Sequence, residues 1–212
     1  MSGVKRSPDA RVVVGAGGHA KVVIAAMRAA GERVDAVLDD NAARWGSMLC
    51  GVPIVGAIAE LADWEGARAV VTIGNNARRK EIVESFPLTT WITVVHPSAI
   101  VHESATVGEG AMVMWRAVVE PDASVGEHAI VNTGAVVCHD ARVGAYAHVS
   151  VTSTLAGGAR VDEGAFVGMN ASVIGGVTVG AWSTVGAGAS VVRDVPANVT
   201  AVGVPARVLP RR

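Results

Sequence analysis

A six-residue period runs without interruption from Ala99 to Asp194 and repeats sixteen times. The first block reads AIVHES and the last reads ASVVRD. Position three is Val in fifteen blocks and Leu155 in the other, and position one is Ala in thirteen blocks. Apolar residues on either side of a mixed residue are typical of a short strand, and the small or polar residues that follow are typical of a turn. Such regularity predicts a stack of equivalent strand–turn units.

The strand of one block has no partner within its own block. Three blocks can close a triangular coil, so that each strand pairs with the equivalent strand three blocks later. At about 4.8 Å between strands, the repeat predicts a three-sided prism roughly 25 Å tall. A β-sandwich of short strands would need turns at irregular spacing. The spacing predicts the coil but not its hand.

Before the repeat, short apolar strands alternate with helical segments, which predicts a small parallel sheet. We expect three strands, at Val12–Val14, from Val34 and at Ala69–Gly74, and a loop over residues 46–56. The period begins near His96, which predicts an α/β domain over residues 1–95 and a repeat domain over residues 96–212.

The segment GAGGHA follows the first strand and opens the first helix. Glycines at this point let backbone N–H groups approach a phosphate at the helix N-terminus. The spacing also satisfies the dinucleotide fingerprint, with Asp39 and Asp40 about 20 residues further on. About eighty residues and three strands leave no second mononucleotide half, so we expect one nucleotide rather than NAD. The alternative is that the glycines only make a tight turn.

The composition excludes several classes of function. The net charge of the 212 residues is −1 and no basic stripe is present, which argues against nucleic-acid binding. No apolar run is long enough for a membrane span, and the first residues lack the pattern of a signal peptide. Cys50 and Cys138 form no ligand pattern, so we expect no metal and a cytoplasmic protein.

Among the six histidines, His139 is distinguished because Asp140 follows it on a predicted turn. A carboxylate beside an imidazole can orient the ring and raise its basicity, although adjacent side chains meet only in some turns. Gly157 lies three blocks after His139 and should occupy the same corner one coil above. A role for Cys138 as a nucleophile is a weaker interpretation than a role for His139 as a base. We expect a structural role for His96. We expect His102 and His128 to lie on solvated turns.

The order of motifs identifies a resemblance that covers nearly the whole chain. GAGGHAK, LDD, IGNN and HPSA precede the hexapeptides, and VGVPARV follows them. This order resembles a family of sugar acyltransferases. That family includes the bacillosamine-pathway UDP-4-amino-sugar N-acetyltransferases, the GDP-perosamine N-acetyltransferases and the sialic-acid O-acetyltransferases. The resemblance implies a half-Rossmann domain followed by a left-handed parallel β-helix, and homotrimers with acetyl-CoA between adjacent prisms.

The resemblance also implies roles for particular residues. It makes His139 the general base with Asp140 as its partner. The residues implied to contact acetyl-CoA are His148, Gly157 and Met169. The residues implied to contact the nucleotide sugar are Gly17, Gly18, His19, Asp39, Asp40 and Gly74.

We therefore expect an acetyl-CoA-dependent N-acetyltransferase acting on a nucleotide-linked 4-amino-6-deoxy sugar, with UDP favoured by the LDD motif. Two alternatives stay open at this stage: O-acetylation of a sialic-acid-like sugar, and a β-helical scaffold without activity. Apolar residues at outward positions favour packing between prisms. These residues are Ile100, Met112, Val118, Ile130, Val136 and Phe166.

Overall fold

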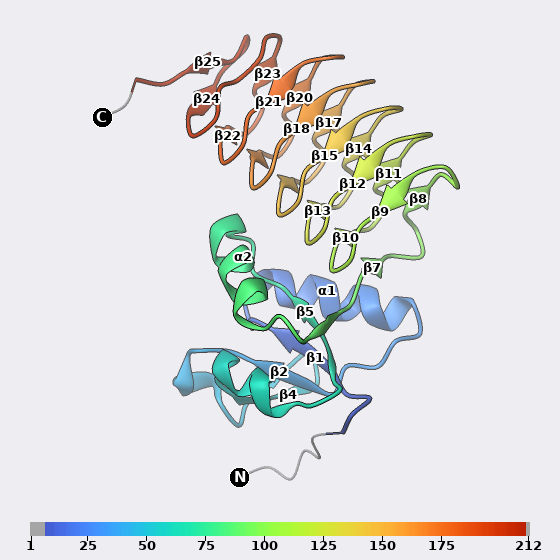
Figure 1. The fold of residues 1–212 in the computed structure, drawn as a ribbon, viewed down its shortest axis with the longest axis vertical. Coiled ribbons are helices and arrows are strands. Elements are labelled where there is room, and N and C mark those ends of the chain that lie inside the picture. The colour runs from blue at the N-terminus through green and yellow to red at the C-terminus, as the bar shows by residue number, and fades with distance from the viewer. Residues whose placement is uncertain (1–6, 211–212) are drawn as a thin grey trace. The chain divides into compact units, whose positions relative to one another are not determined.

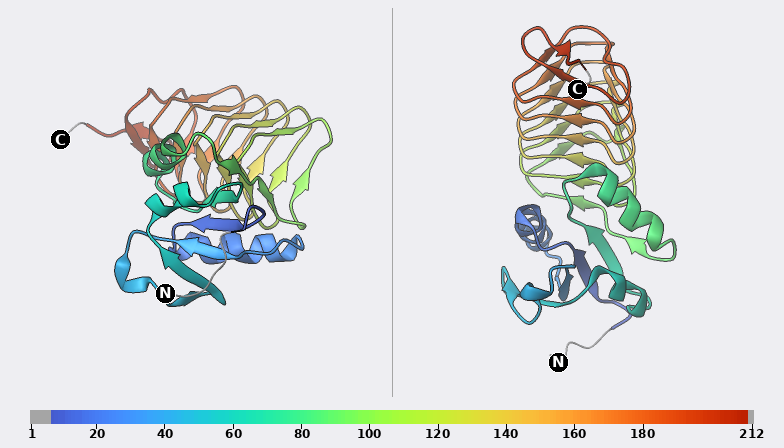
Figure 2. Two further views of the ribbon diagram at one scale, coloured as in Figure 1. Left: turned by 60° about the horizontal axis from the view of Figure 1, so that its bottom comes forward. Right: turned by 90° about the vertical axis from the view of Figure 1, so that its left-hand side faces the viewer.

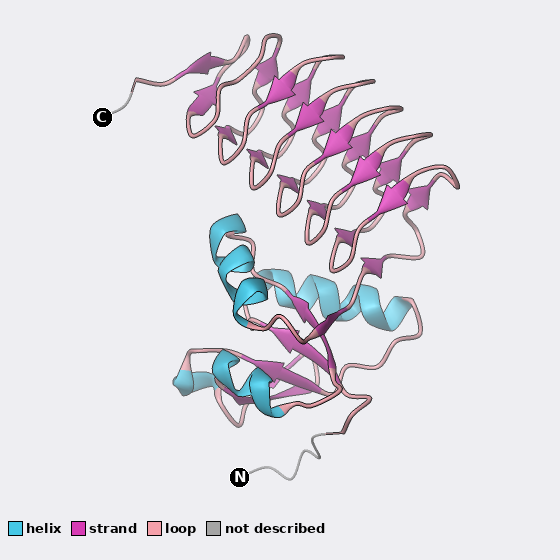
Figure 3. Cartoon of the chain, viewed as in Figure 1, coloured by secondary structure: helices cyan, strands magenta, loops and turns pink. Residues whose placement is uncertain are grey.

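The computed structural model describes residues 7–210, which form two compact units (Figure 1). The division falls between Val94 and Val95, one residue before the expected boundary. Within the described residues, all helices lie in the first unit, and the second is built from strands and turns (Figure 3). No described helix has the length and hydropathy that a membrane crossing requires.

The first unit is an α/β sheet with strand order β3-β4-β2-β1-β5-β6. All neighbouring strands pair in parallel except β3 with β4. The strand order reverses at β1, and the carboxyl ends of β1 and β5 therefore flank a switch point where α/β sheets bind ligands. The elements are β1 (Arg11–Val14), α1 (Gly18–Ala29), β2 (Ala36–Leu38), η1 (Ala42–Arg44), β3 (Met48–Leu49), β4 (Val52–Gly56), η2 (Ile58–Asp63), β5 (Arg68–Val71), α2 (Asn76–Ser85) and β6 (Thr90–Trp91).

The expectation of three strands is wrong. The segment expected as a loop contains β3 and β4, and β4 shows the alternating burial of a strand, with Val52 and Ile54 buried. Glycines and Pro53 interrupt this segment, which made it resemble a loop. With six strands in the sheet, the strand count no longer argues against a dinucleotide.

The second unit is a parallel β-helix whose coils stack as rungs (Figure 2). Three sheets form its faces, and every registered pair within the hexapeptide blocks joins equivalent residues three blocks apart, as Val118 with Val136. The three-sided coil is therefore confirmed. Its strands are β7 (Val94–Val95), β8 (Ile100–Val101), β9 (Thr106–Val107), β10 (Met112–Val113), β11 (Val118–Val119), β12 (Ser124–Val125), β13 (Ile130–Val131), β14 (Val136–Val137), β15 (Arg142–Val143), β16 (His148–Val149), β17 (Thr154–Leu155), β18 (Arg160–Val161), β19 (Phe166–Val167), β20 (Ser172–Val173), β21 (Thr178–Val179), β22 (Thr184–Val185), β23 (Ser190–Val191), β24 (Thr200–Val202) and β25 (Arg207–Val208).

The prism core consists of the inward residues of positions one and three. Ala135, Val137 and Leu155 are fully buried, as are their equivalents in most coils. Position six takes a positive φ at almost every corner, for example 60° at Asp140. The amide after each such residue closes a turn, as Ala141 N–H donates to the Cys138 carbonyl at 3.1 Å. This is the pattern of a turn with a left-handed third residue.

The outward apolar residues do not all form an exposed surface. Met112 and Ile130 are fully covered within the single chain, which corrects the expectation that they are free to pack against another prism. Ile100 is 66% exposed, and Val118, Val136 and Phe166 are half-buried. Ile100, Val118 and Val136 therefore leave partly exposed apolar side chains on the sheet that contains β8, β11 and β14.

Candidate active site

His139 and Asp140 form a hydrogen-bonded pair on the turn that follows β14. The Nδ1 atom of His139 lies 2.8 Å from Oδ2 of Asp140, and both side chains are exposed. An ionised carboxylate can only accept, so Nδ1 is the donor and Nε2 is left with a free lone pair. The positive φ of Asp140 shapes the turn in which these adjacent side chains meet. The pair therefore has the arrangement of a base and its orienting group.

The surroundings of His139 favour its charged form. The hydrogen bond that His139 donates to Asp140 is the main cause that raises the pKa of His139, and the negative charges of Asp140 and Glu120 add to it. Because its pKa is raised, neutral His139 is a stronger base than an ordinary histidine and binds a proton more tightly.

Directly above His139, the corner carries no side chain. A Cβ atom on Gly157 would lie 2.4 Å from Cε1 of the imidazole, so any side chain there requires this ring to move. Gly158 N–H donates to the His139 carbonyl at 2.9 Å, which ties the two coils together. The next coil has Gly175 and Gly176 at the same two positions. Bare backbone thus extends for two coils above the imidazole.

Cys138 lies beside His139 but has the character of a protonated thiol. Burial is the main cause that raises the pKa of Cys138, and the neighbouring Glu120 carboxylate adds to it by its charge and by a hydrogen bond. Since the thiolate is the nucleophile, this environment argues against covalent catalysis by Cys138. Sequence reasoning missed Glu120, although the three-block register places it directly below Cys138.

His148 and Met169 lie away from the His139 corner of the same chain. His148 lies on β16, in a different sheet, and is buried. Its Nε2 atom lies 3.1 Å from Nδ2 of Asn132, and its ring packs edge-on against Phe166. Met169 follows β19 of that same sheet and is 52% exposed. Within one chain, the residues implied for acetyl-CoA therefore divide between two corners of the prism.

In the first unit, the glycine turn lies at the carboxyl edge of the sheet. A Cβ atom on Gly17, Gly18 or Gly74 would meet nothing within 4 Å, so these glycines face open space. Gly15 differs, because its φ of 98° and the nearby Ile73 side chain leave no room for a Cβ. Gly17 caps α1 without a side-chain hydrogen bond, and a helix N-terminus of this kind favours an anion.

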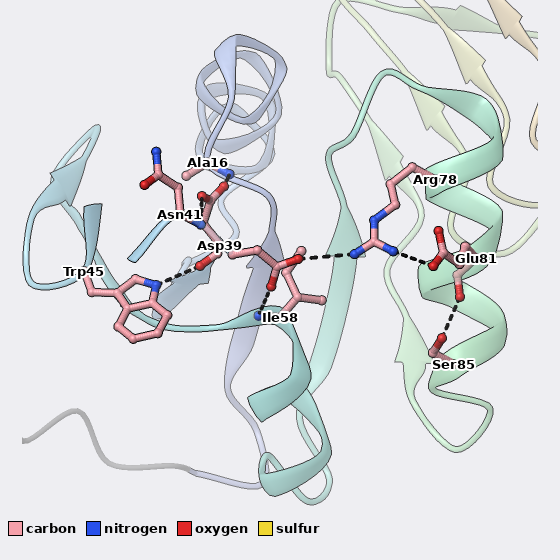
Figure 4. A network of polar contacts seen from close by, with 9 residues as sticks. Ala16, Asp39, Asn41, Trp45, Ile58, Arg78, Glu81 and Ser85 are labelled. Carbon is pink, nitrogen blue, oxygen red and sulfur yellow. Dashed lines mark hydrogen bonds and ion pairs between the residues drawn. The ribbon is translucent and has the colours of Figure 1, made fainter. Parts of the chain in front are cut away.

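The two acidic residues after β2 hold this edge together (Figure 4). Asp39 accepts from Ala16 N–H at 2.6 Å with one oxygen and from Asn41 N–H at 3.0 Å with the other. Asp40 accepts from Ile58 N–H at 3.1 Å and pairs with Arg78 at 3.2 Å. Both carboxylates thus have structural partners, in addition to any ligand that they contact.

The remaining histidines differ in environment. Burial, with a smaller effect of Arg79, lowers the pKa of His19 to about 4, so His19 is neutral at pH 7. His96 is buried against Trp115, in keeping with a structural role, and His102 is exposed. The expectation of a solvated turn is wrong for His128, which is buried and stacks on Tyr146.

Among the described residues, no group of His, Cys, Asp and Glu has the arrangement of a metal site.

Known families and curated proteins match parts of the chain. Residues 12–86 match the family described as the PglD N-terminal domain. UDP-N-acetylbacillosamine N-acetyltransferase of Bacillus subtilis (strain 168) is 43% identical over 112 residues, which are 48% of this chain and 50% of that protein. The match thus spans about half the length of this curated relative.

Solved structures match over nearly the whole length. A variant of perosamine N-acetyltransferase from Caulobacter crescentus, in complex with CoA and GDP-perosamine, is 42% identical with a TM-score of 0.91. The match covers 97% of this chain and 99% of that chain. The acetyltransferase domain of PglB from Neisseria gonorrhoeae, in complex with acetyl coenzyme A, is 36% identical with a TM-score of 0.89. This match covers 94% of this chain and 98% of that chain.

Proposed function

Because the chain belongs to the hexapeptide-repeat sugar acetyltransferases, the family of the bacillosamine and perosamine N-acetyltransferases, we propose that it acetylates the amino group of a nucleotide-linked sugar with acetyl-CoA. The observation that carries the proposal is the hydrogen-bonded His139–Asp140 pair beneath Gly157. A scaffold without activity has no need for an imidazole with an orienting carboxylate and an open second nitrogen.

In the proposed reaction, the sugar amine attacks the thioester carbonyl carbon while Nε2 of His139 takes the proton of the amine. The tetrahedral adduct collapses as the carbon–sulfur bond breaks. The leaving thiolate takes up the proton from His139, and the products are the N-acetyl sugar and free CoA. Asp140 keeps the imidazole in the tautomer with Nε2 as acceptor and stabilises the imidazolium that forms.

The bare corner above His139 suits the acyl donor. Gly157 N–H makes no hydrogen bond to another described residue, and it lies next to the imidazole. A free backbone amide there is able to donate to the oxygen on which charge develops. We assign the glycines of the next coil, Gly175 and Gly176, to the path of the thioester arm. His148 and Met169 complete the donor site from the facing corner of a neighbouring prism in a homotrimer.

The first unit is proposed to hold the nucleotide sugar. Gly17, Gly18 and the N-terminus of α1 suit the diphosphate, and a Cβ on Gly74 would also face open space. Neutral His19 contributes a hydrogen bond rather than a charge. Asp39 and Asp40 accept from N–H groups of the base. The LDD motif favours uridine, whereas the full-length match to an enzyme crystallised with GDP-perosamine favours guanosine, so both bases belong in the test.

The test measures CoA release with a thiol reagent, from acetyl-CoA and a panel of UDP-, GDP- and dTDP-linked 4-amino-6-deoxy sugars, with free sialic acid beside them. We expect turnover with one nucleotide amino sugar and its loss, by about 100-fold or more, in His139→Ala. Turnover with sialic acid alone would establish O-acetylation instead. Absence of turnover across the panel, from a folded protein, would favour the scaffold hypothesis.

A further inference from the structure

Glu120 lies one coil below the proposed base, on the turn after β11. Because β11 pairs with β14 so that Val118 lies opposite Val136, position 120 lies under position 138. Its Oε2 atom accepts a hydrogen bond from the backbone N–H of His139 at 2.9 Å. The same carboxylate also contributes to the raised pKa of the Cys138 thiol. One side chain thus holds the main chain of the turn that carries the imidazole.

The acceptor for the corresponding amide differs in the preceding turn. In the turn after β13, Thr133 N–H is held by the side chain of Asn132, which precedes it in the same turn, at 2.8 Å. At the equivalent position before His139 the chain has Cys138, whose sulfur is a weak acceptor. The acceptor for His139 N–H therefore comes from the coil below.

We propose that Glu120 is a positioning residue for His139: it fixes the main chain of the catalytic turn and supplies a second carboxylate beside the imidazole. This inference rests on the proposed function of His139. It assigns Glu120 no contact with substrate. It predicts that the geometry and basicity of His139 depend on two acids from successive coils, Asp140 in its own turn and Glu120 beneath it.

The charged groups around His139 all lie on its own coil or below it. Asp140 and Glu120 contact the residue directly, and Asp122 lies one coil below Asp140. The coil above contributes only glycine backbone, Gly157 and Gly158. Burial, with a smaller effect of Glu120, raises the pKa of the Cys138 thiol, which favours its neutral form. Among residues 7–210, removal of the Glu120 charge therefore leaves Asp140 as the one carboxylate in contact with His139.

The experiment follows the imidazole protons of His139 by NMR as a function of pH in the full chain, which requires no turnover. Glu120→Gln keeps an oxygen for His139 N–H but removes the charge, and Glu120→Ala removes both. We expect the midpoint of the His139 titration to fall by about half a pH unit in both variants. Glu103→Gln, an exposed acid two coils below His139, is the matched control and should leave the midpoint unchanged.

Steady-state kinetics separate charge from positioning. We expect Glu120→Gln to keep most of the wild-type kcat, and Glu120→Ala to lose about tenfold in kcat with little change in the KM for acetyl-CoA. A His139 midpoint that stays within about 0.1 unit of wild type in Glu120→Ala, in a folded protein, would overturn the inference. An inactive wild-type protein would refute the proposed function instead, while the NMR titration still tests the effect of Glu120 on His139.

Discussion

At the scale of single residues, the proposed chemistry depends on backbone conformation as much as on side-chain type. Asp140 occupies a position where the corner turn requires a positive φ, which aspartate tolerates better than most residues. In this turn its carboxylate meets the imidazole of the preceding residue. The same turn that closes the coil therefore also orients the proposed base.

The first prediction concerns the pH dependence of Asp140→Asn. Because the Asp140 hydrogen bond raises the pKa of His139 in the wild type, the neutral base is lost as pH falls through this raised value. Removal of the carboxylate lowers the pKa, so the acidic limb of kcat/KM should move to lower pH by about half a unit or more. The plateau rate should fall by about tenfold, since the tautomer is no longer fixed. A pH profile from 5 to 9 measures both effects, and an unmoved acidic limb would refute the role of Asp140.

The second prediction concerns Gly157→Ala. The added methyl would lie 2.4 Å from the His139 ring, so the imidazole has to move away from the thioester path. We expect kcat to fall by about 10- to 100-fold, because small displacements of a catalytic group are costly. The free energy of unfolding should change by less than about 1 kcal/mol, since the His139 side chain is exposed and can move into solvent once it leaves Asp140. Kinetics and chemical denaturation of the same preparation check this, and wild-type kcat would exclude the proposed packing.

At the scale of elements, the β-helix is stabilised by a column of inward side chains from successive coils. Leu155 is the only Leu at position three and is fully buried. Leu155→Ala should lower the free energy of unfolding by about 2–5 kcal/mol, and Leu155→Val by about 1 kcal/mol. Thr154→Ala, on the outward side of the same strand, should stay within about 0.5 kcal/mol of wild type. Equal losses for Thr154→Ala and Leu155→Ala in urea denaturation would contradict this account of the core.

The carboxyl edge of the first sheet makes a separate prediction. Both oxygens of Asp39 accept from backbone N–H groups, and Asn has only one acceptor oxygen. Asp39→Asn should therefore loosen the glycine turn and raise the KM for the nucleotide sugar by about tenfold, with kcat at saturation less affected. Asp35→Asn is the control, because Asp35 makes a similar contact to Arg11 N–H at the amino edge. An unchanged KM in Asp39→Asn would mean that the turn does not bind the sugar nucleotide.

Elements that repeat with a fixed period can be predicted from the sequence, whereas elements outside the period are harder to predict. The coil register and the inward positions could be predicted from the repeat, because every coil buries the same residue types at the same positions. The strand β4 was missed because Pro53 and its flanking glycines resemble a turn, although β2 pairs with this segment. His128 was misread because the Tyr146 ring that covers it comes from the next coil. The structural contacts of Asp39 leave no signal in the local sequence at all.

At the scale of the whole molecule, the proposed donor site is incomplete in one chain. His139 and Gly157 share one corner of the prism, whereas His148 and Met169 belong to the sheet on another face. A second prism whose facing corner approaches His139 would bring the two sets together. The half-buried Val118 and Val136 lie on the sheet next to the His139 corner, and we propose that sheet as the surface for such a contact.

The last prediction is therefore that assembly and turnover fail together. Sedimentation of the wild type should give a mass of about three times the 21.5 kDa chain. Val136→Lys places a charge on the outward side of β14 and should shift the mass toward one chain, because an unpaired charge in an apolar contact is costly. CoA release should then be lost, while nucleotide-sugar binding by the first unit persists. Ser124→Lys, outward on the sheet of β12, should leave both mass and turnover unchanged. A single-chain wild type with full turnover would show that one chain holds the whole donor site.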